Sequence, residues 1–174
     1  MSSFIINKES YARCAGVLAA IGSQKDYYGE KLFYKYDAKK GDIYGIEDFK
    51  NEIMSLYELS AKSVALQYNE AEWSDPKDYS AAFEDYFIKA IKVYKRAYVN
   101  GSQQDKAEFN RLCYYVNDFF SSVGYQIEDL NCCRKAFNIM NWYSRALLRV
   151  MKKINEDQDS MCWGSFDYFE EERE

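Results

Sequence analysis

The chain has 174 residues, a mass of 20.5 kDa and a formal net charge of −5. It contains no histidine, which excludes imidazole bases, His-assisted nucleophiles and His metal ligands. Because 48% of the residues are apolar and 18% are aromatic, the composition is that of a folded chain rather than a disordered one. We therefore expect a single helical domain at residues 1–155, followed by a C-terminal tail at residues 156–174.

The first helix is predicted to begin after Asn7, whose side chain can cap it, and to end at Gly22. Its apolar residues share one helical face: Tyr11, Cys14, Ala15, Leu18 and Ile21. The N-terminus has no basic region followed by a long apolar one, and the longest apolar run, residues 15–21, is far shorter than a membrane span. We expect a cytoplasmic protein with no membrane attachment.

Residues 23–45 form a Tyr-rich insert without helical periodicity. Two structures are open for this insert. One is a short β-hairpin with strands at residues 32–36 and 42–44, and the other is a short helix followed by an irregular loop.

The next two helices have clear boundary signals. The second helix is predicted at about residues 46–67, where acidic residues occupy the first turn. In the third, Asp75 fits the N-cap and Pro76 fits the first helical position, where its missing N–H is not needed. Asn100 and Gly101 are expected to end this helix.

The last two helices are also amphipathic. Ser102 and Asp105 resemble a capping box at the start of the fourth helix, and Gly124 is expected to close it. The final helix is predicted from about residue 126 to residue 154, with a nearly heptad-like seam that fits either the core or self-association. Short connections predict antiparallel packing among the last three helices. The fold class is therefore all-α, a bundle of about five helices.

Charge is distributed unevenly along the chain. Residues 1–75 carry a net charge of −3, residues 76–155 a net charge of +5, and residues 156–174 a net charge of −7. The acidity of the protein thus belongs mainly to the tail. The candidate partner-binding residues there are Glu156, Asp157, Asp159, Trp163, Phe166, Asp167, Tyr168, Phe169, Glu170, Glu171 and Glu172.

Two interpretations of the tail are open. Its aromatic side chains can fold back onto the bundle while its carboxylates shield a basic face, or the tail can dock onto a basic partner. The basic residues of the third and last helices likewise fit either solvated faces or a phosphate-binding surface. These candidate residues are Lys89, Lys92, Lys95, Arg96, Arg145, Arg149, Lys152 and Lys153.

The sequence contains no recognisable catalytic or metal-binding pattern. The five Cys are odd in number and form no CxxC pair, which favours reduced thiols, with Cys113 and one of Cys132 and Cys133 in the core. There is no phosphate-binding loop, dinucleotide fingerprint or nucleophile elbow. We therefore assign no catalytic residue, no metal ligand and no cofactor.

Two short segments resemble a group of uncharacterised small proteins encoded on phages and conjugative elements. They are Phe4-Ile5-Ile6-Asn7-Lys8-Glu9, and Ser63-Val64-Ala65-Leu66-Gln67-Tyr68-Asn69, in which Gln67 stands where that group usually has Arg. The resemblance implies an accessory protein of a mobile element, a setting that includes anti-CRISPR and other anti-defence inhibitors.

The leading hypothesis is a non-enzymatic protein-interaction module, an anti-CRISPR-like inhibitor that occludes a basic, nucleic-acid-handling partner such as a CRISPR effector. The first alternative is a helical module that binds nucleic acid and carries an autoinhibitory acidic tail. The second alternative is a small enzyme whose motif is not recognisable.

Overall fold

The computed structural model describes residues 7–25, 29, 31–33, 45–68 and 80–155. Within these ranges it contains five α-helices and no β-strand, which confirms the predicted all-α bundle of about five helices. None of the described helices is long and apolar enough to cross a membrane. The helical elements in chain order are α1 (Lys8–Gly22), α2 (Ile46–Tyr68), α3 (Ser80–Lys95), the π-helical turn η2 (Arg96–Asn100), α4 (Gln103–Ile127), the 3-10 turn η3 (Asn131–Cys133) and α5 (Arg134–Asn155).

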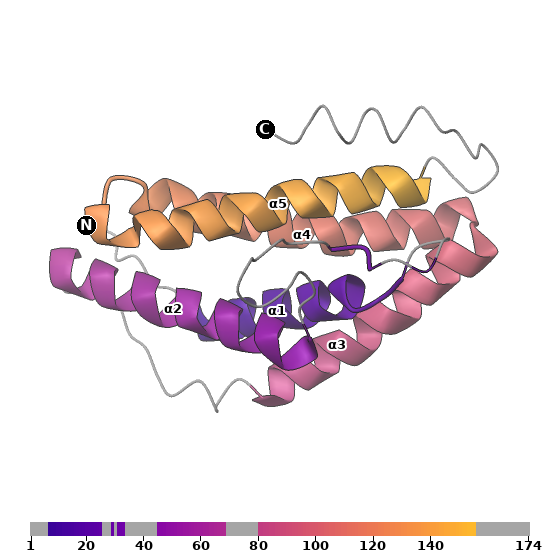
Figure 1. Cartoon of the computed structure of the whole chain (residues 1–174), viewed down its shortest axis with the longest axis horizontal. Coiled ribbons are helices and arrows are strands. Elements are labelled where there is room, and N and C mark those ends of the chain that lie inside the picture. The colour runs from indigo at the N-terminus through magenta and orange to yellow at the C-terminus, as the bar shows by residue number, and fades with distance from the viewer. Residues whose placement is uncertain (1–6, 26–28, 30, 34–44, 69–79, 156–174) are drawn as a thin grey trace.

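The bundle is built around α1, which contacts α2, α3 and α4. Figure 1 shows α4 and α5 side by side along one edge of the molecule, α2 on the opposite side, and α3 running obliquely to the start of α4. All residues of α1 from Tyr11 to Gly22 are buried except Arg13. A helix that is apolar on nearly every side is typical of the centre of a helical domain.

The close contact between α1 and α3 depends on Gly16. A Cβ atom at this position would lie 2.7 Å from the carbonyl oxygen of Phe83 and 2.9 Å from the backbone nitrogen of Phe87. The two backbones can approach this closely only because Gly16 has no side chain. As a result, α3 packs more extensively on α1 than on α4, and the antiparallel packing predicted for the last three helices is found between α4 and α5.

The predicted caps of the first and fourth helices are confirmed. The side-chain oxygen of Asn7 accepts hydrogen bonds from the backbone N–H groups of Glu9 (2.8 Å) and Ser10 (3.2 Å). The Ser102 hydroxyl accepts a hydrogen bond from the Asp105 backbone N–H (3.1 Å) and donates one to the Asp105 carboxylate (2.9 Å). These bonds satisfy N–H groups that have no partner within their own helix.

The predicted end of the third helix is confirmed as well. α3 continues through η2 to Asn100, and Gly101 follows with φ 69°, a left-handed conformation that favours glycine. The backbone N–H of Gly101 donates a hydrogen bond to the carbonyl oxygen of Arg96 (3.3 Å). Asp75 and Pro76, the predicted start of this helix, lie outside the described residues.

The boundary between the last two helices differs from the prediction. α4 does not end at Gly124 but continues to Ile127, and α5 begins at Arg134 rather than near residue 126. Gly124 is buried, and a Cβ atom there would lie 3.1 Å from Cε1 of Phe137 on α5. This glycine therefore serves close packing between α4 and α5, not helix termination.

The Tyr-rich insert is described only in part. Residues 34–44, which contain most of both candidate strands, lie outside the described residues, so the hairpin stays a prediction. Phe33 is buried, and its ring centroid lies 5.8 Å from that of Phe49 and 6.2 Å from that of Tyr143. Phe33 therefore joins the insert to both α2 and α5.

Aromatic side chains fill the centre of the bundle. The buried ring of Tyr11 packs edge-to-face against Tyr57 and Phe119, with centroid distances of 5.4 and 5.2 Å. Most of the seam predicted for the last helix is buried against the rest of the chain: Leu130, Cys133, Met140, Tyr143, Leu147, Val150, Met151 and Ile154. The seam thus belongs to the core of this chain.

Candidate functional site

The candidate phosphate-binding lysines of α3 are accessible. Lys89, Lys92 and Lys95 are all exposed, and their spacing of three residues makes them neighbours on the helix surface. The ammonium nitrogen of Lys89 lies 5.9 Å from the ring centroid of Tyr86, within the range of a cation–π contact. This part of α3 therefore presents a short row of positive charges to solvent.

Arg96 has a structural role at the junction of η2 and α4. Its guanidinium donates hydrogen bonds to the carboxylates of Asp105 (3.2 Å) and Glu108 (2.6 Å). The hydrogen bond from the Ser102 hydroxyl, and then that from Arg96, lowers the pKa of Asp105, while the hydrogen bond with Asp105 raises the pKa of Arg96. Arg96 is thus engaged with α4, unlike the lysines that precede it.

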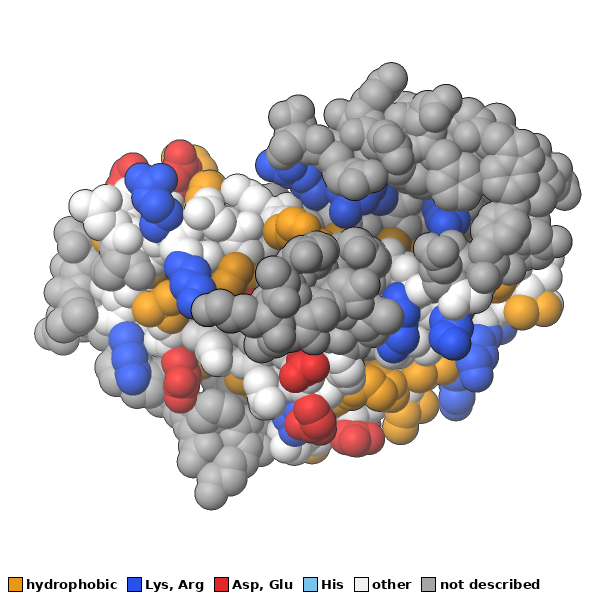
Figure 2. Space-filling model, in the orientation of Figure 1, with side chains coloured by type: hydrophobic (Ala, Val, Ile, Leu, Met, Phe, Trp, Pro, Cys, Tyr) orange, Lys and Arg blue, Asp and Glu red, His pale blue; other side chains and the backbone are white. Residues whose placement is uncertain are grey.

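α5 carries a larger net charge than any other described helix, with six basic residues and no acidic residue. Four of the six are the candidate phosphate-binding residues of the last helix: Arg145, Arg149, Lys152 and Lys153. Arg145 is exposed and the other three are half-buried. Figure 2 shows Lys and Arg side chains along both α5 and α3 on one face of the molecule. Basic side chains of both helices are therefore visible on one face of the molecule.

The tail has no described structure. All of its candidate residues, from Glu156 to Glu172, lie outside the described residues. The last described residue, Asn155, exchanges two side-chain hydrogen bonds with Asn110 of α4, of 3.2 and 2.8 Å. The chain therefore enters the tail from a fixed point beside α4.

Three cysteines have described side chains, and all three are buried. Cys14, Cys113 and Cys133 are buried free thiols, as predicted for Cys113 and for one of the adjacent pair. Burial raises the pKa of the thiols of Cys14 and Cys113 far above the ordinary value, so neither forms a thiolate nucleophile at neutral pH. Among the residues that the structure describes, no three His, Cys, Asp or Glu side chains are grouped to hold a metal ion.

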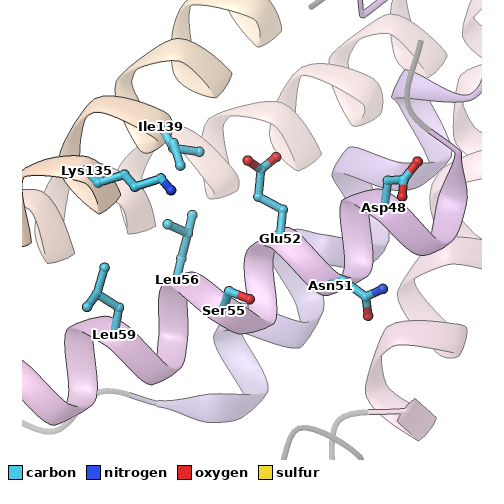
Figure 3. Close-up of a pocket in the computed structure, with 8 residues that line it drawn as sticks. All are labelled: Asp48, Asn51, Glu52, Ser55, Leu56, Leu59, Lys135 and Ile139. Carbon is cyan, nitrogen blue, oxygen red and sulfur yellow. The ribbon is translucent and has the colours of Figure 1, made fainter. Parts of the chain in front are cut away.

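A hollow of about 510 Å³ lies between α2 and α5. Figure 3 shows Glu52 and Leu56 of α2 pointing toward α5, and Lys135 of α5 extending toward α2. The residues that line it are Asp48, Asn51, Glu52, Ser55, Leu56, Leu59, Lys135 and Ile139. These side chains combine an apolar wall with acidic and basic groups, which suits recognition of a polar ligand or partner.

Glu52 also has a partner in the core. The hydroxyl of the buried Tyr143 donates a hydrogen bond of 2.5 Å to its carboxylate. This bond links α5 to α2 beside the hollow and fixes the orientation of Glu52. The hydrogen-bonded pair thus has a structural explanation, because it joins α5 to α2.

A second hollow, of about 380 Å³, surrounds Arg13 where α1, α3 and α4 meet. The guanidinium carbon lies 3.9 Å from the ring centroid of Tyr115 and 4.6 Å from that of Tyr86. The sequence does not reveal this arrangement, because it depends on the meeting of three helices. The sequence holds one signal, a charged residue inside the otherwise apolar stretch from Tyr11 to Gly22.

The structure thus places basic side chains of α3 and α5 on one face and adds two hollows that the sequence does not reveal. It assigns Arg96 to an ion-paired helix junction and leaves the predicted tail site outside the described residues. Comparison of the chain with protein-family models, with curated proteins and with solved structures finds no match.

Proposed function

We propose that the protein is a non-enzymatic interaction module that binds a macromolecular partner through charge. One observation carries this proposal: α5 has six basic residues and no acidic residue, and residues 156–174 directly after it carry a net charge of −7. A strongly acidic segment is attracted to basic surfaces, and a strongly basic helix face is attracted to anionic ones. The two segments therefore suit binding to a charged partner better than they suit catalysis.

In the leading form of the proposal, the tail is the binding element. Its carboxylates take the place of nucleic-acid phosphates on a basic partner, and Trp163, Phe166, Tyr168 and Phe169 anchor it. The resemblance to small proteins of phages and conjugative elements supports an anti-defence role in the cytoplasm. The partner is then a CRISPR effector, and the helical bundle supplies the bulk that blocks its nucleic-acid site.

Capture of CRISPR effectors on the immobilised full chain tests this form. We expect the immobilised chain to retain the effector at about 50 mM salt, where screening of exposed charges is weak, and to release it at about 500 mM salt. The full-chain variant E170Q/E171Q/E172Q should retain several-fold less effector, because it lacks three of the tail carboxylates.

The matched control neutralises three exposed glutamates on the bundle, in the variant E47Q/E84Q/E128Q. Both variants change the net charge by the same amount, so only a role of the tail itself separates them. Equal retention by the two variants, or no effector captured at low salt, would contradict the leading form.

A second candidate is favoured by the shared basic face of α3 and α5. Here the helices bind the phosphates of a nucleic acid, and the tail competes with that nucleic acid for the same face. The variant E170Q/E171Q/E172Q should then bind a DNA duplex of about 30 base pairs more tightly than the wild type, with a steep dependence on salt. Failure of both proteins to retard the duplex at low salt would contradict this candidate.

A further inference from the structure

The environment of Arg13 is unusual for a charged side chain on a central helix. Arg13 is the one residue between Tyr11 and Gly22 that is not buried, and its guanidinium lies within cation–π distance of two rings, those of Tyr86 on α3 and Tyr115 on α4. A guanidinium carries its N–H donors at the edge of its plane, so contact with aromatic rings does not use them.

Arg13 has no anionic partner among the residues that the structure describes. Its Nε atom is buried without a hydrogen-bond partner, and no described carboxylate forms an ion pair with it. Glu9 stands four residues earlier on α1, which is the spacing at which Glu and Arg pair on a helix surface. The guanidinium of Arg13 thus contacts two tyrosine rings and forms no ion pair with Glu9 or with another described carboxylate.

The hollow that Arg13 lines has the volume of a small-ligand site. Its volume of about 380 Å³ lies within the usual range for such sites, about 300–1,000 Å³. Its polar lining includes the side chains of Asn7 and Ser10, and two exposed carboxylates, those of Glu9 and Asp85. One guanidinium and two carboxylates therefore share one hollow.

This charge pattern selects among ligands. A phosphate dianion would be attracted to Arg13 but repelled by Glu9 and Asp85. A simple cation would be attracted to the carboxylates but repelled by the guanidinium. A ligand with a carboxylate at one end and an ammonium at the other satisfies both, because a guanidinium edge binds a carboxylate through two parallel hydrogen bonds.

We propose that the hollow around Arg13 binds a small zwitterion of the amino-acid type. The ligand carboxylate bonds to the guanidinium edge of Arg13, and the ligand ammonium lies near Glu9 and Asp85. The proposal uses none of the residues to which the function proposed above is assigned, so it does not rest on that function.

Nuclear magnetic resonance of the full chain with ¹⁵N-labelled arginine tests the proposal. The Nε–H signal of Arg13, assigned with the variant R13K, is followed during addition of glycine, L-leucine or L-glutamine. Acetate, methylammonium and inorganic phosphate are the comparison probes. We expect a saturable shift with at least one amino acid, at a Kd about tenfold or more below that of each comparison probe.

Three variants test whether the carboxylates of Glu9 and Asp85 contribute to binding. E9Q and D85N should each weaken amino-acid binding about fivefold and strengthen phosphate binding, because each removes one negative charge from the hollow. E84Q changes an exposed carboxylate on the same helix that does not line the hollow, and it should leave both affinities unchanged.

R13K keeps the positive charge but loses the planar edge, and it should lose at least about tenfold in affinity. Its free energy of unfolding, measured in urea, shows whether the variant is folded during the titration. Y86F and Y115F keep both rings and should keep binding. The proposal would be overturned if the Arg13 Nε–H signal showed no saturable shift with any of the amino acids up to about 20 mM. It would also be overturned if acetate or phosphate bound as tightly as the amino acids.

Discussion

Gly16 and Gly124 both allow two helices to meet closely, but their neighbours differ. At Gly16 the nearest atoms belong to the backbone of Phe83 and Phe87, which cannot rotate away from an added methyl group. At Gly124 the nearest atom belongs to the ring of Phe137, and a few tenths of an ångström of movement relieve the contact. The two glycines therefore differ in their tolerance of alanine.

Gly16→Ala should lower the free energy of unfolding by about 1–3 kcal/mol, because α1 and α3 must move apart. Gly124→Ala should have a smaller effect, since a side chain can adjust. Urea unfolding followed by circular dichroism measures both. A Gly16→Ala protein as stable as the wild type would show that α1 and α3 do not pack through their backbones.

The buried thiols allow a second test at the level of single residues. Cys14 and Cys113 are fully buried, and burial raises their thiol pKa values, so alkylation by iodoacetamide at pH 8 should modify them only when the bundle opens. Peptide mass spectrometry should find both unmodified in the native protein and both modified in urea. Equal labelling rates under the two conditions would contradict the described core.

The Arg13 stack shows which site features the sequence cannot reveal. Tyr86 and Tyr115 lie 29 residues apart in the chain and far from Arg13, and their rings meet its guanidinium only because α1, α3 and α4 converge. By contrast, the exposed row Lys89, Lys92 and Lys95 follows directly from helical spacing. Local charge patterns are predictable from one sequence, while contacts between distant elements are not.

At the level of elements, the positions of the helices can be predicted from caps and apolar spacing. Which helices pack against each other cannot be predicted in this way. The hydroxyl of Ser102 and the side chain of Asn7 form the caps that their residue types predict. The predicted end of the fourth helix at Gly124 was wrong, because the sequence does not distinguish a glycine packed between two helices from a glycine that ends a helix. The packing of α3 on α1 depends on Gly16, whose neighbours are known only from the fold.

The junction of η2 and α4 predicts a pH dependence. The Ser102 hydroxyl and Arg96 lower the pKa of Asp105 below the ordinary value of 3.8, so the charged form of Asp105 stabilises the folded state. This contribution is present above pH 3.8 and is lost as the pH falls through the lowered pKa. The difference in free energy of unfolding between the wild type and Asp105→Asn should therefore be largest near neutral pH and should shrink as the pH falls below 3.8.

Urea unfolding of the two proteins from about pH 7 to about pH 3 measures this difference. The stability difference between the wild type and Ser102→Ala should also shrink at low pH, but by less. This variant removes the largest cause of the lowered Asp105 pKa and leaves the hydrogen bond from Arg96 in place. A difference between wild type and Asp105→Asn that stays constant over this range would contradict the described junction.

At the level of the whole molecule, charge is separated along the chain. The apolar side of α5 is buried in the core while its six basic residues face outward or lie half-buried at its border. Figure 2 shows basic side chains along α3 on the same face as those of α5, and the acidic tail follows α5 in the sequence. The overall composition is weakly acidic, whereas α5 carries six basic and no acidic residues and the acidic residues are concentrated in the segment that follows it in the sequence.

This separation predicts the effect of altering the basic face. The full-chain variant K89E/K92E/R145E should abolish binding of a DNA duplex if the helices hold nucleic acid, because it reverses three exposed positive charges. The same variant should leave capture of a basic effector intact if the tail is the binding element. Gel retardation and effector capture, performed on the same preparation, measure the two outcomes.

The most direct test of the proposed function is the fluorescence anisotropy of a labelled DNA duplex bound to a CRISPR effector while the full chain is added. We expect the anisotropy to fall to the value of the free duplex at about 50 mM salt and to stay high at about 500 mM salt. The variant E170Q/E171Q/E172Q should require several-fold higher concentrations to produce the same fall. An anisotropy that stays at the effector-bound value at every concentration of the protein would contradict the proposed function.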